Sequence, residues 1–124
     1  MDKQPNKHGL TRIIGAAGYS LSGLKTCFVN EAAFRQEVLL FIVLLPILVL
    51  LPVSVVMKIV LLLVNTLVLI VELLNSAVEA IVDKASPEFN HLAKGAKDMG
   101  SAAVLLSLLA AGSAWTVAIV SILG

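Results

Sequence analysis

Three long apolar segments divide the chain, at residues 38–57, from about residue 53 or 58 to 83, and at 99–124, and they predict helices at about residues 31–51, 54–84 and 92–122. Each contains the roughly 20 apolar residues that a helix needs to cross a bilayer. The segments are unbroken, and they lack the alternation of apolar and polar positions that a membrane β-strand shows. The pattern therefore predicts an all-α membrane protein in which residues 1–124 form one domain with three transmembrane helices.

Two prolines and a polar end modify this picture. Pro46 lies inside the first apolar segment and is expected to kink its helix, whereas Pro52 is expected to end that helix near the far interface. The second segment is too long for a single crossing. We therefore expect its polar C-terminal end to emerge into the headgroups and water.

The N-terminal arm has a helical period of its own over about residues 8–29. Polar side chains such as Arg12 and Lys25 fall mostly away from the apolar face. We expect an amphipathic helix on the membrane surface, which acts either as a plain anchor or as a lid or wall beside a site. The apolar positions are Leu10, Ile13, Ile14, Ala17, Leu21, Leu24 and Phe28.

Composition supports the membrane assignment. Hydrophobic residues make up 59% of the 124 and charged residues 14%, against about 45–50% and 25% in ordinary soluble proteins. The formal net charge is +1, so no basic surface for nucleic acid is expected. The single cysteine, Cys27, leaves no internal disulfide and is interpreted as a small half-buried residue.

Lysine and arginine are unevenly distributed between the connections. They are frequent before the first apolar segment and between the second and third, whereas only Lys58 lies between the first and second. Because positive residues gather on the cytoplasmic side, we expect a cytoplasmic N-terminus and an outward C-terminus. The residues concerned are Lys3, Lys7, Arg12, Lys25 and Arg35 in the arm, and Lys84, Lys94 and Lys97 in the second connection.

A polar stripe interrupts the second apolar segment. Glu72, Asn75, Glu79 and Asp83 are spaced so that the three acids fall within roughly 20° of one line on a helix. One polar residue would indicate a hydrogen bond between helices, but repeated acids at this depth cost free energy. Three carboxylates on one stripe favour a divalent metal or a proton transfer.

A first additional cluster precedes the first apolar segment. The stretch "NEAAFRQE" carries Glu31, Arg35 and Gln36 within one to two helical turns. Its plainest interpretation is a solvated helix start with surface ion pairs, which contribute little stability.

A second additional cluster, "AKGAKDMGSAA", leads into the third apolar segment. Lys94, Lys97 and Asp98 lie where a phosphate could be met, and Gly95 and Gly100 permit close helix packing. The alternative is a positive flank with small packing residues. Carboxylates for a metal and lysines for phosphates suit phosphoryl transfer to a lipid hydroxyl, although the chain has no Walker A loop.

Four stretches follow one another along the chain: "LTRIIGAAGYS", "NEAAFRQE", "ELLNSAVEAIVD" and "AKDMGSAAVL". In this order and spacing they resemble the small bacterial integral-membrane diacylglycerol kinases, and the similarity covers essentially the whole chain. The resemblance implies a homotrimer of three-span subunits, each with an N-terminal surface helix. It also implies transfer of the γ-phosphoryl group of MgATP to diacylglycerol, giving phosphatidic acid, at the cytoplasmic face of the bacterial inner membrane.

The resemblance further implies a role for each matching residue. Glu72 would be the general base toward the lipid hydroxyl, and Asn75 would help place the reacting groups. Lys97 would neutralise phosphate charge, with Asp98 acting beside it. The divalent metal, Mg²⁺ or another ion, would be held by Glu31 and Glu79. The remaining positions of the nucleotide site would be Arg12, Tyr19, Gln36, Glu37 and Ser101.

One stretch departs from the pattern of the enterobacterial diacylglycerol kinases. "SPEFNHLAKGAKD" carries Pro87 and His91, and a histidine here resembles the related undecaprenol kinases. "GLTRIIGAAGYS", "FRQE" and "DMGSAA" favour the diacylglycerol branch, and His91 is interpreted as a surface residue. Undecaprenol stays the alternative lipid. A small ion-binding or transporter-like bundle is the remote alternative, disfavoured by the nearly featureless third segment.

Overall fold

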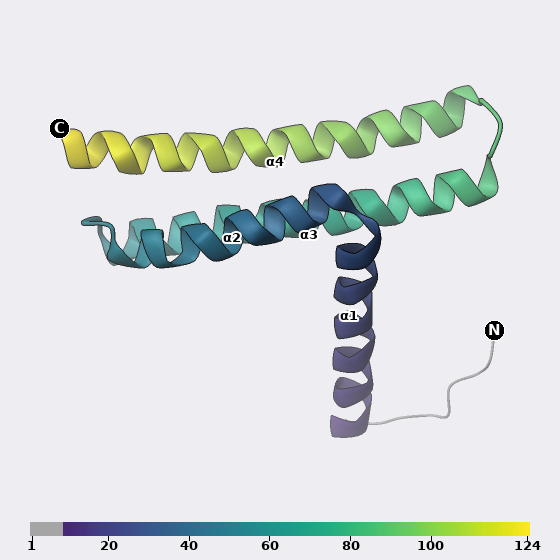
Figure 1. Ribbon diagram of the computed structural model, residues 1–124, viewed down its shortest axis with the longest axis horizontal. Coiled ribbons are helices and arrows are strands. Elements are labelled where there is room, and N and C mark those ends of the chain that lie inside the picture. The colour runs from purple at the N-terminus through teal and green to yellow at the C-terminus, as the bar shows by residue number, and fades with distance from the viewer. Residues whose placement is uncertain (1–8) are drawn as a thin grey trace.

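The computed structural model describes residues 9–124, which form four helices and no strand (Figure 1). The expected all-α class is therefore confirmed. The first expected helix was placed from residue 8, which lies outside the described residues. The helices are α1, Leu10–Asn30; α2, Ala32–Leu50; α3, Val55–Ala85; and α4, His91–Leu123.

Local chemistry explains where the helices begin. The Ser54 side chain accepts a hydrogen bond from the Met57 N–H at 3.1 Å and caps α3. The Asn90 side chain accepts from the Leu92 N–H at 2.8 Å and caps α4. Between α1 and α2, one extended residue, Glu31, with φ −118° and ψ 110°, interrupts the helix. This one non-helical residue changes the direction of the chain between α1 and α2.

The two prolines of the first apolar segment occupy different environments. Helix α2 continues through Pro46, and Pro52 lies just beyond its end, as expected from a residue that cannot continue a helix. The turn that follows is held by Lys58, whose Nζ donates to the Val49 carbonyl at 2.6 Å. The tight α2–α3 connection therefore brings the two helices together as an antiparallel pair.

Helix α3 is the centre of the fold. Helices α2 and α4 both pack on α3, whereas within the described chain they do not pack on one another. Leu61 of α3 is fully buried between Leu48 of α2 and Ala118 of α4. Because α2 and α4 do not meet within residues 9–124, a groove is left open between them over α3.

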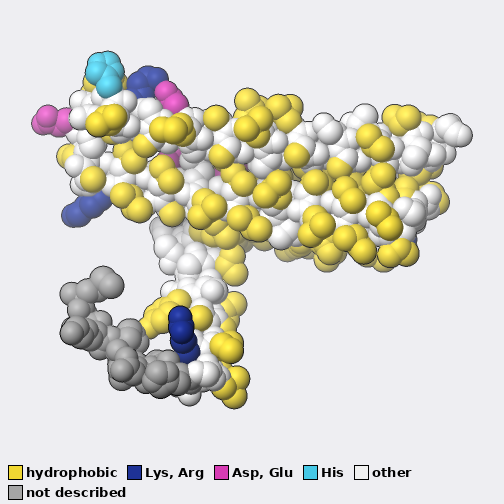
Figure 2. All heavy atoms as spheres, turned by 180° about the vertical axis from the view of Figure 1, so that it is seen from behind, with side chains coloured by type: hydrophobic (Ala, Val, Ile, Leu, Met, Phe, Trp, Pro, Cys, Tyr) yellow, Lys and Arg dark blue, Asp and Glu magenta, His cyan; other side chains and the backbone are white. Residues whose placement is uncertain are grey.

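The outer surface of α2, α3 and α4 is apolar. All three helices are long and apolar enough to cross a membrane, and their large hydrophobic side chains are mostly exposed. Figure 2 shows hydrophobic side chains over most of the visible face of these helices, with acidic residues, histidine and most basic residues near one end. Exposure on this scale is unsuited to water but suited to lipid, which makes the chain a multi-pass membrane protein.

Helix α1 runs across the direction of the other three helices (Figure 1). It meets α2 toward the end of the molecule where α3 and α4 are joined, and away from the C-terminus. Leu10, Ile13 and Ile14 on α1 are exposed. If α2, α3 and α4 cross a bilayer, α1 lies in the orientation of an interfacial helix.

Candidate active site

Glu72 is the most deeply placed acid of the polar stripe. Its side chain is only 7% exposed, although it lies in the apolar part of the molecule. Glu37 of α2, Glu79 of α3 and Glu31 at the α1–α2 junction are close enough to act on it through their charges. The charges of three other carboxylates therefore reach Glu72, which is costly unless a cation or proton is part of the function.

The stripe on α3 becomes more accessible toward the α3–α4 connection. Glu72 is buried, as is Asn65 seven residues before it on the same helix, whereas Asn75 and Glu79 are half-buried and Asp83 is exposed. Glu72 and Glu79 are seven residues apart, which is about 10 Å of helix rise. The exposure of the stripe therefore increases along α3, from a position among apolar side chains to one that water can reach.

Asn75 lies against Gly100 at the α3–α4 interface. A Cβ atom built on Gly100 would lie within 3.2 Å of Asn75 Cγ and still closer to Oδ1. The expectation that Gly100 allows close packing is confirmed. The same expectation for Gly95 is wrong within this chain, because a Cβ atom there would meet nothing within 4 Å.

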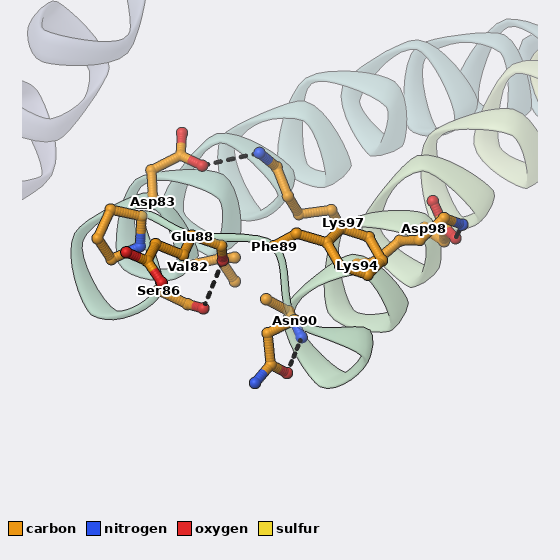
Figure 3. A pocket seen from close by; sticks show the side chains of 11 residues that line it. Val82, Asp83, Ser86, Glu88, Phe89, Asn90, Lys94, Lys97 and Asp98 are labelled. Atoms are coloured by element: carbon orange, nitrogen blue, oxygen red, sulfur yellow. Dashed lines mark hydrogen bonds and ion pairs between the residues drawn. The ribbon is translucent and has the colours of Figure 1, made fainter.

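A cavity of ≈ 470 Å³ lies where α3 joins α4 (Figure 3). Lys97 reaches from α4 to α3, where its Nζ donates to Asp83 Oδ1 at 2.7 Å. Asp98 points the other way and pairs with Lys94 at 2.6 Å. Lys97 and Asp98 therefore line one hollow but belong to separate ion pairs, and the Lys97–Asp83 pair links the two helices.

A larger hollow, of ≈ 930 Å³, lies between α1 and α3. Tyr19 and Glu31 line it from the N-terminal side, and Ser76 and Ala80 line it from α3. Apart from Leu73, the α3 wall is made of small side chains, which leaves room beneath the crossing helix. Of the two functions considered for the N-terminal helix, this geometry favours a wall beside a site.

Other predicted residues are not gathered into one site within a single chain. Gln36 and Ser101 are exposed on α2 and α4. Arg12 is exposed near the far end of α1, about 27 Å of helix rise from Asn30. His91, interpreted as a surface residue, is exposed, and its ring contacts Phe89 with a centroid separation of 5.2 Å.

The sequence patterns missed two contacts. Trp115 donates from Nε1 to Asn65 Oδ1 at 2.9 Å, and both line a ≈ 270 Å³ groove with Glu37. Arg35, expected in surface ion pairs, instead donates to the Phe28 and Val29 carbonyls, at 2.9 Å each. The only tryptophan of the chain was a usable signal for the first contact, since a buried indole N–H requires an acceptor.

The carboxylates around Glu72 fit a magnesium ion only in part. Within residues 9–124 no three His, Cys, Asp or Glu side chains form a ready-made metal site. Mg²⁺ in phosphoryl-transfer sites, however, commonly takes one or two carboxylates, with phosphate oxygens and water completing its shell. Glu31 and Glu79 are half-buried hard oxygen donors whose charges both reach Glu72, so their chemistry suits a site of two carboxylates.

The sequence was compared with those of known proteins and protein families. The family model for prokaryotic diacylglycerol kinases matches residues 18–119. The chain is 50% identical to the diacylglycerol kinase of Pseudomonas aeruginosa over 107 residues, which are 86% of this chain and 87% of the relative. It is 45% identical to the diacylglycerol kinase of Escherichia coli K12 over 112 residues, which are 90% and 92% of the two chains.

A membrane-embedded enzyme with a buried carboxylate at Glu72 is thus the class that the fold and the comparisons define. The chain belongs to the prokaryotic diacylglycerol kinase family, and it is a kinase.

Proposed function

We propose that the protein transfers the γ-phosphoryl group of ATP to the free hydroxyl of diacylglycerol, giving phosphatidic acid for lipid recycling. The observation that carries this proposal is the burial of Glu72 within reach of the charges of Glu31, Glu37 and Glu79. The relatives from Escherichia coli K12 and Pseudomonas aeruginosa are called diacylglycerol kinases. We propose the bacterial inner membrane as the location, with the site and the N-terminus at its cytoplasmic face.

In this proposal Glu72 is the general base. Its carboxylate takes the proton from the lipid hydroxyl as the lipid oxygen bonds to the γ-phosphorus, and the bond from that phosphorus to the β–γ bridging oxygen breaks. ADP carries away the electron pair of the broken bond. Glu72 is buried in the apolar part of the molecule, and in this proposal the lipid hydroxyl reaches it from the lipid phase. Asn75, one turn away, helps place the reacting groups.

The nucleotide is proposed to lie on the accessible side of the stripe. Lys97 neutralises phosphate charge, with Asp98 beside it in the same hollow. Lys97 is already oriented by Asp83, so an arriving phosphate exchanges one anionic partner for another. The surrounding positions are proposed to be Arg12, Tyr19, Gln36, Glu37 and Ser101.

Glu31 and Glu79 are proposed to hold Mg²⁺. When bound, this ion would offset negative charge on the phosphates and on the carboxylates whose charges reach Glu72. Holding the ion between the α1–α2 junction and α3 would also tie the N-terminal arm to the helix that carries the base. Catalysis by positioning and charge neutralisation is typical of phosphoryl transfer.

We propose a homotrimer with sites shared between subunits. The support is the open arrangement of one chain, in which α2 and α4 do not pack on one another and the predicted site residues occupy separate hollows. Extensive apolar surface remains on all three long helices. A neighbouring subunit would close the groove and bring the hollows into one site.

The test is a kinase assay on the detergent-solubilised protein with MgATP and short-chain diacylglycerol. Glu72→Gln should lower kcat by about 10²–10⁴-fold, because the amide cannot accept the proton, with the thermal unfolding midpoint unchanged. Full activity in this variant would refute the role of Glu72. Turnover of undecaprenol in preference to diacylglycerol would overturn the substrate proposal, and absence of ATP consumption with either lipid would overturn the kinase assignment for this site.

A further inference from the structure

Gly100 is the position where α4 comes against a polar side chain of the proposed reaction centre. A Cβ atom at this position would overlap the side-chain oxygen of Asn75, whereas at Gly95 and Gly112 on the same helix it would meet nothing within 4 Å. The requirement for glycine is therefore local to residue 100. It comes from contact with Asn75 and not from a general need for small residues on α4.

The contact also orients the Asn75 amide. The Asn75 Oδ1 atom is shielded from solvent and has no hydrogen-bond partner. The Nδ2 atom of the same amide is not shielded and unpartnered in this way. With its oxygen against Gly100, the amide is limited to presenting its N–H₂ group away from α4. An Asn side chain has two donors and one acceptor group, so this orientation offers the accessible side a hydrogen-bond donor.

We propose that Gly100 is a positioning residue for the kinase reaction. It leaves room for the Asn75 carbonyl and thereby aims the amide N–H₂ at an oxygen of the reacting groups, one helical turn from Glu72. This inference rests on the proposed function and assigns Asn75 a donor's part in it. The oxygens available to such a donor are those of the transferred phosphoryl group and of the lipid hydroxyl, which gain negative charge or lose a proton during transfer.

The experiment compares Gly100→Ala with the matched control Gly95→Ala, using the full chain in detergent with MgATP and diacylglycerol. Both changes add one methyl group to the same part of α4, but only the first meets Asn75. Gly100→Ala should lower kcat by about 100-fold, as expected for a misplaced group at a reaction centre. The KM values for both substrates should change by no more than about threefold, because the contact acts on transfer rather than on binding. Gly95→Ala should keep the parent kcat.

The same substitution in an Asn75→Ala background separates positioning from general damage. If Gly100 acts through Asn75, adding Gly100→Ala to Asn75→Ala causes no further loss. Asn75→Asp, which keeps the shape and removes the donor, should lose activity as Asn75→Ala does. Equal losses from Gly100→Ala in both backgrounds, parent-like activity in Gly100→Ala, or an active Asn75→Asp would each overturn the inference.

Folding offers an independent readout. If Gly100→Ala unfolds at a lower temperature, shortening residue 75 in the double variant Gly100→Ala with Asn75→Ser should recover the midpoint, and failure to recover it would overturn the contact. A parent protein without kinase activity would refute the proposed function, while this stability coupling could still be measured. An Asn75→Ala variant with full activity would refute the part given to Asn75 and leave the kinase assignment intact.

Discussion

The Trp115 indole donates a hydrogen bond to the Asn65 side-chain oxygen, at 2.9 Å, across the α3–α4 interface. Asn65 is 8% exposed, and its amide nitrogen has no partner. The bond is therefore a polar link inside an otherwise apolar part of the molecule, one heptad from Glu72. It lies between the small core and the reaction centre, where it fixes the register of α4 on α3.

Removing either partner of this bond should destabilise the protein. Asn65→Leu leaves the indole N–H unpaired and Trp115→Phe leaves the Asn65 oxygen unpaired, each at a cost of about 1–2 kcal/mol. The double variant should recover roughly 1 kcal/mol relative to the sum, because neither polar group is then left alone. Unfolding in mixed detergent micelles measures the cycle, and strictly additive losses would show that the bond contributes nothing.

The Lys97–Asp83 ion pair predicts which lysine serves the nucleotide. Lys97→Met should lower kcat/KM for ATP by about 10²–10³-fold, as expected from loss of a group that stabilises charge in transfer. Lys84→Met is the matched control. Lys84 is exposed on α3 next to Asp83, the partner of Lys97, and it has no place in the proposed site. A comparable loss in Lys84→Met would show that only the total positive charge at this surface matters.

The carboxylates proposed to hold Mg²⁺ can be told apart from the proposed base by titration. Glu31→Gln and Glu79→Gln should raise the Mg²⁺ concentration for half-maximal rate by about tenfold, and added Mg²⁺ should restore part of the rate. Glu72→Gln should not be restored, because it lacks the group that takes the proton. An unchanged Mg²⁺ requirement in both metal-site variants would move the ion to other residues.

Arg35 predicts how the N-terminal helix is held in place. Its guanidinium donates to the last carbonyls of α1, at Phe28 and Val29, which would otherwise lack helical partners. Arg35→Met should destabilise the end of α1 by about 1–2 kcal/mol, which is roughly 5–30-fold faster local exchange. Hydrogen–deuterium exchange over α1 measures this, with Lys25→Met as a control for loss of one positive charge. Equal exchange in both variants would contradict the stabilisation of α1 by the hydrogen bonds of Arg35.

The architecture could be predicted from the sequence because it depends on the polarity of long stretches of residues and not on single contacts. Runs of apolar residues, their length against the bilayer and the stripe of acids on α3 predicted four helices and an accessible polar end of α3. The exposed state of His91 and the packing use of Gly100 also followed. The helix bounds differ from those expected by one or two residues, since local caps such as Ser54 and Asn90 set them.

The pairing of individual polar groups could not be predicted in the same way. Lys97 and Asp98 are adjacent in sequence, but successive residues of a helix point about 100° apart. One therefore reaches Asp83 and the other Lys94. Arg35 was expected to meet an acid and instead caps a helix, because the extended residue Glu31 turns the end of α1 toward it.

The sequence by itself determined the class of protein, the number of helices that can cross a membrane and the residues available for chemistry, since these follow from side-chain polarity and helical period. Only the tertiary structure decided that α3 is central, that α2 and α4 leave a groove open, and that Asn75 lies against Gly100 with its oxygen turned inward. The reason is that periodicity assigns a residue to a face of its own helix, whereas the approach of two helices depends on the shapes of both surfaces.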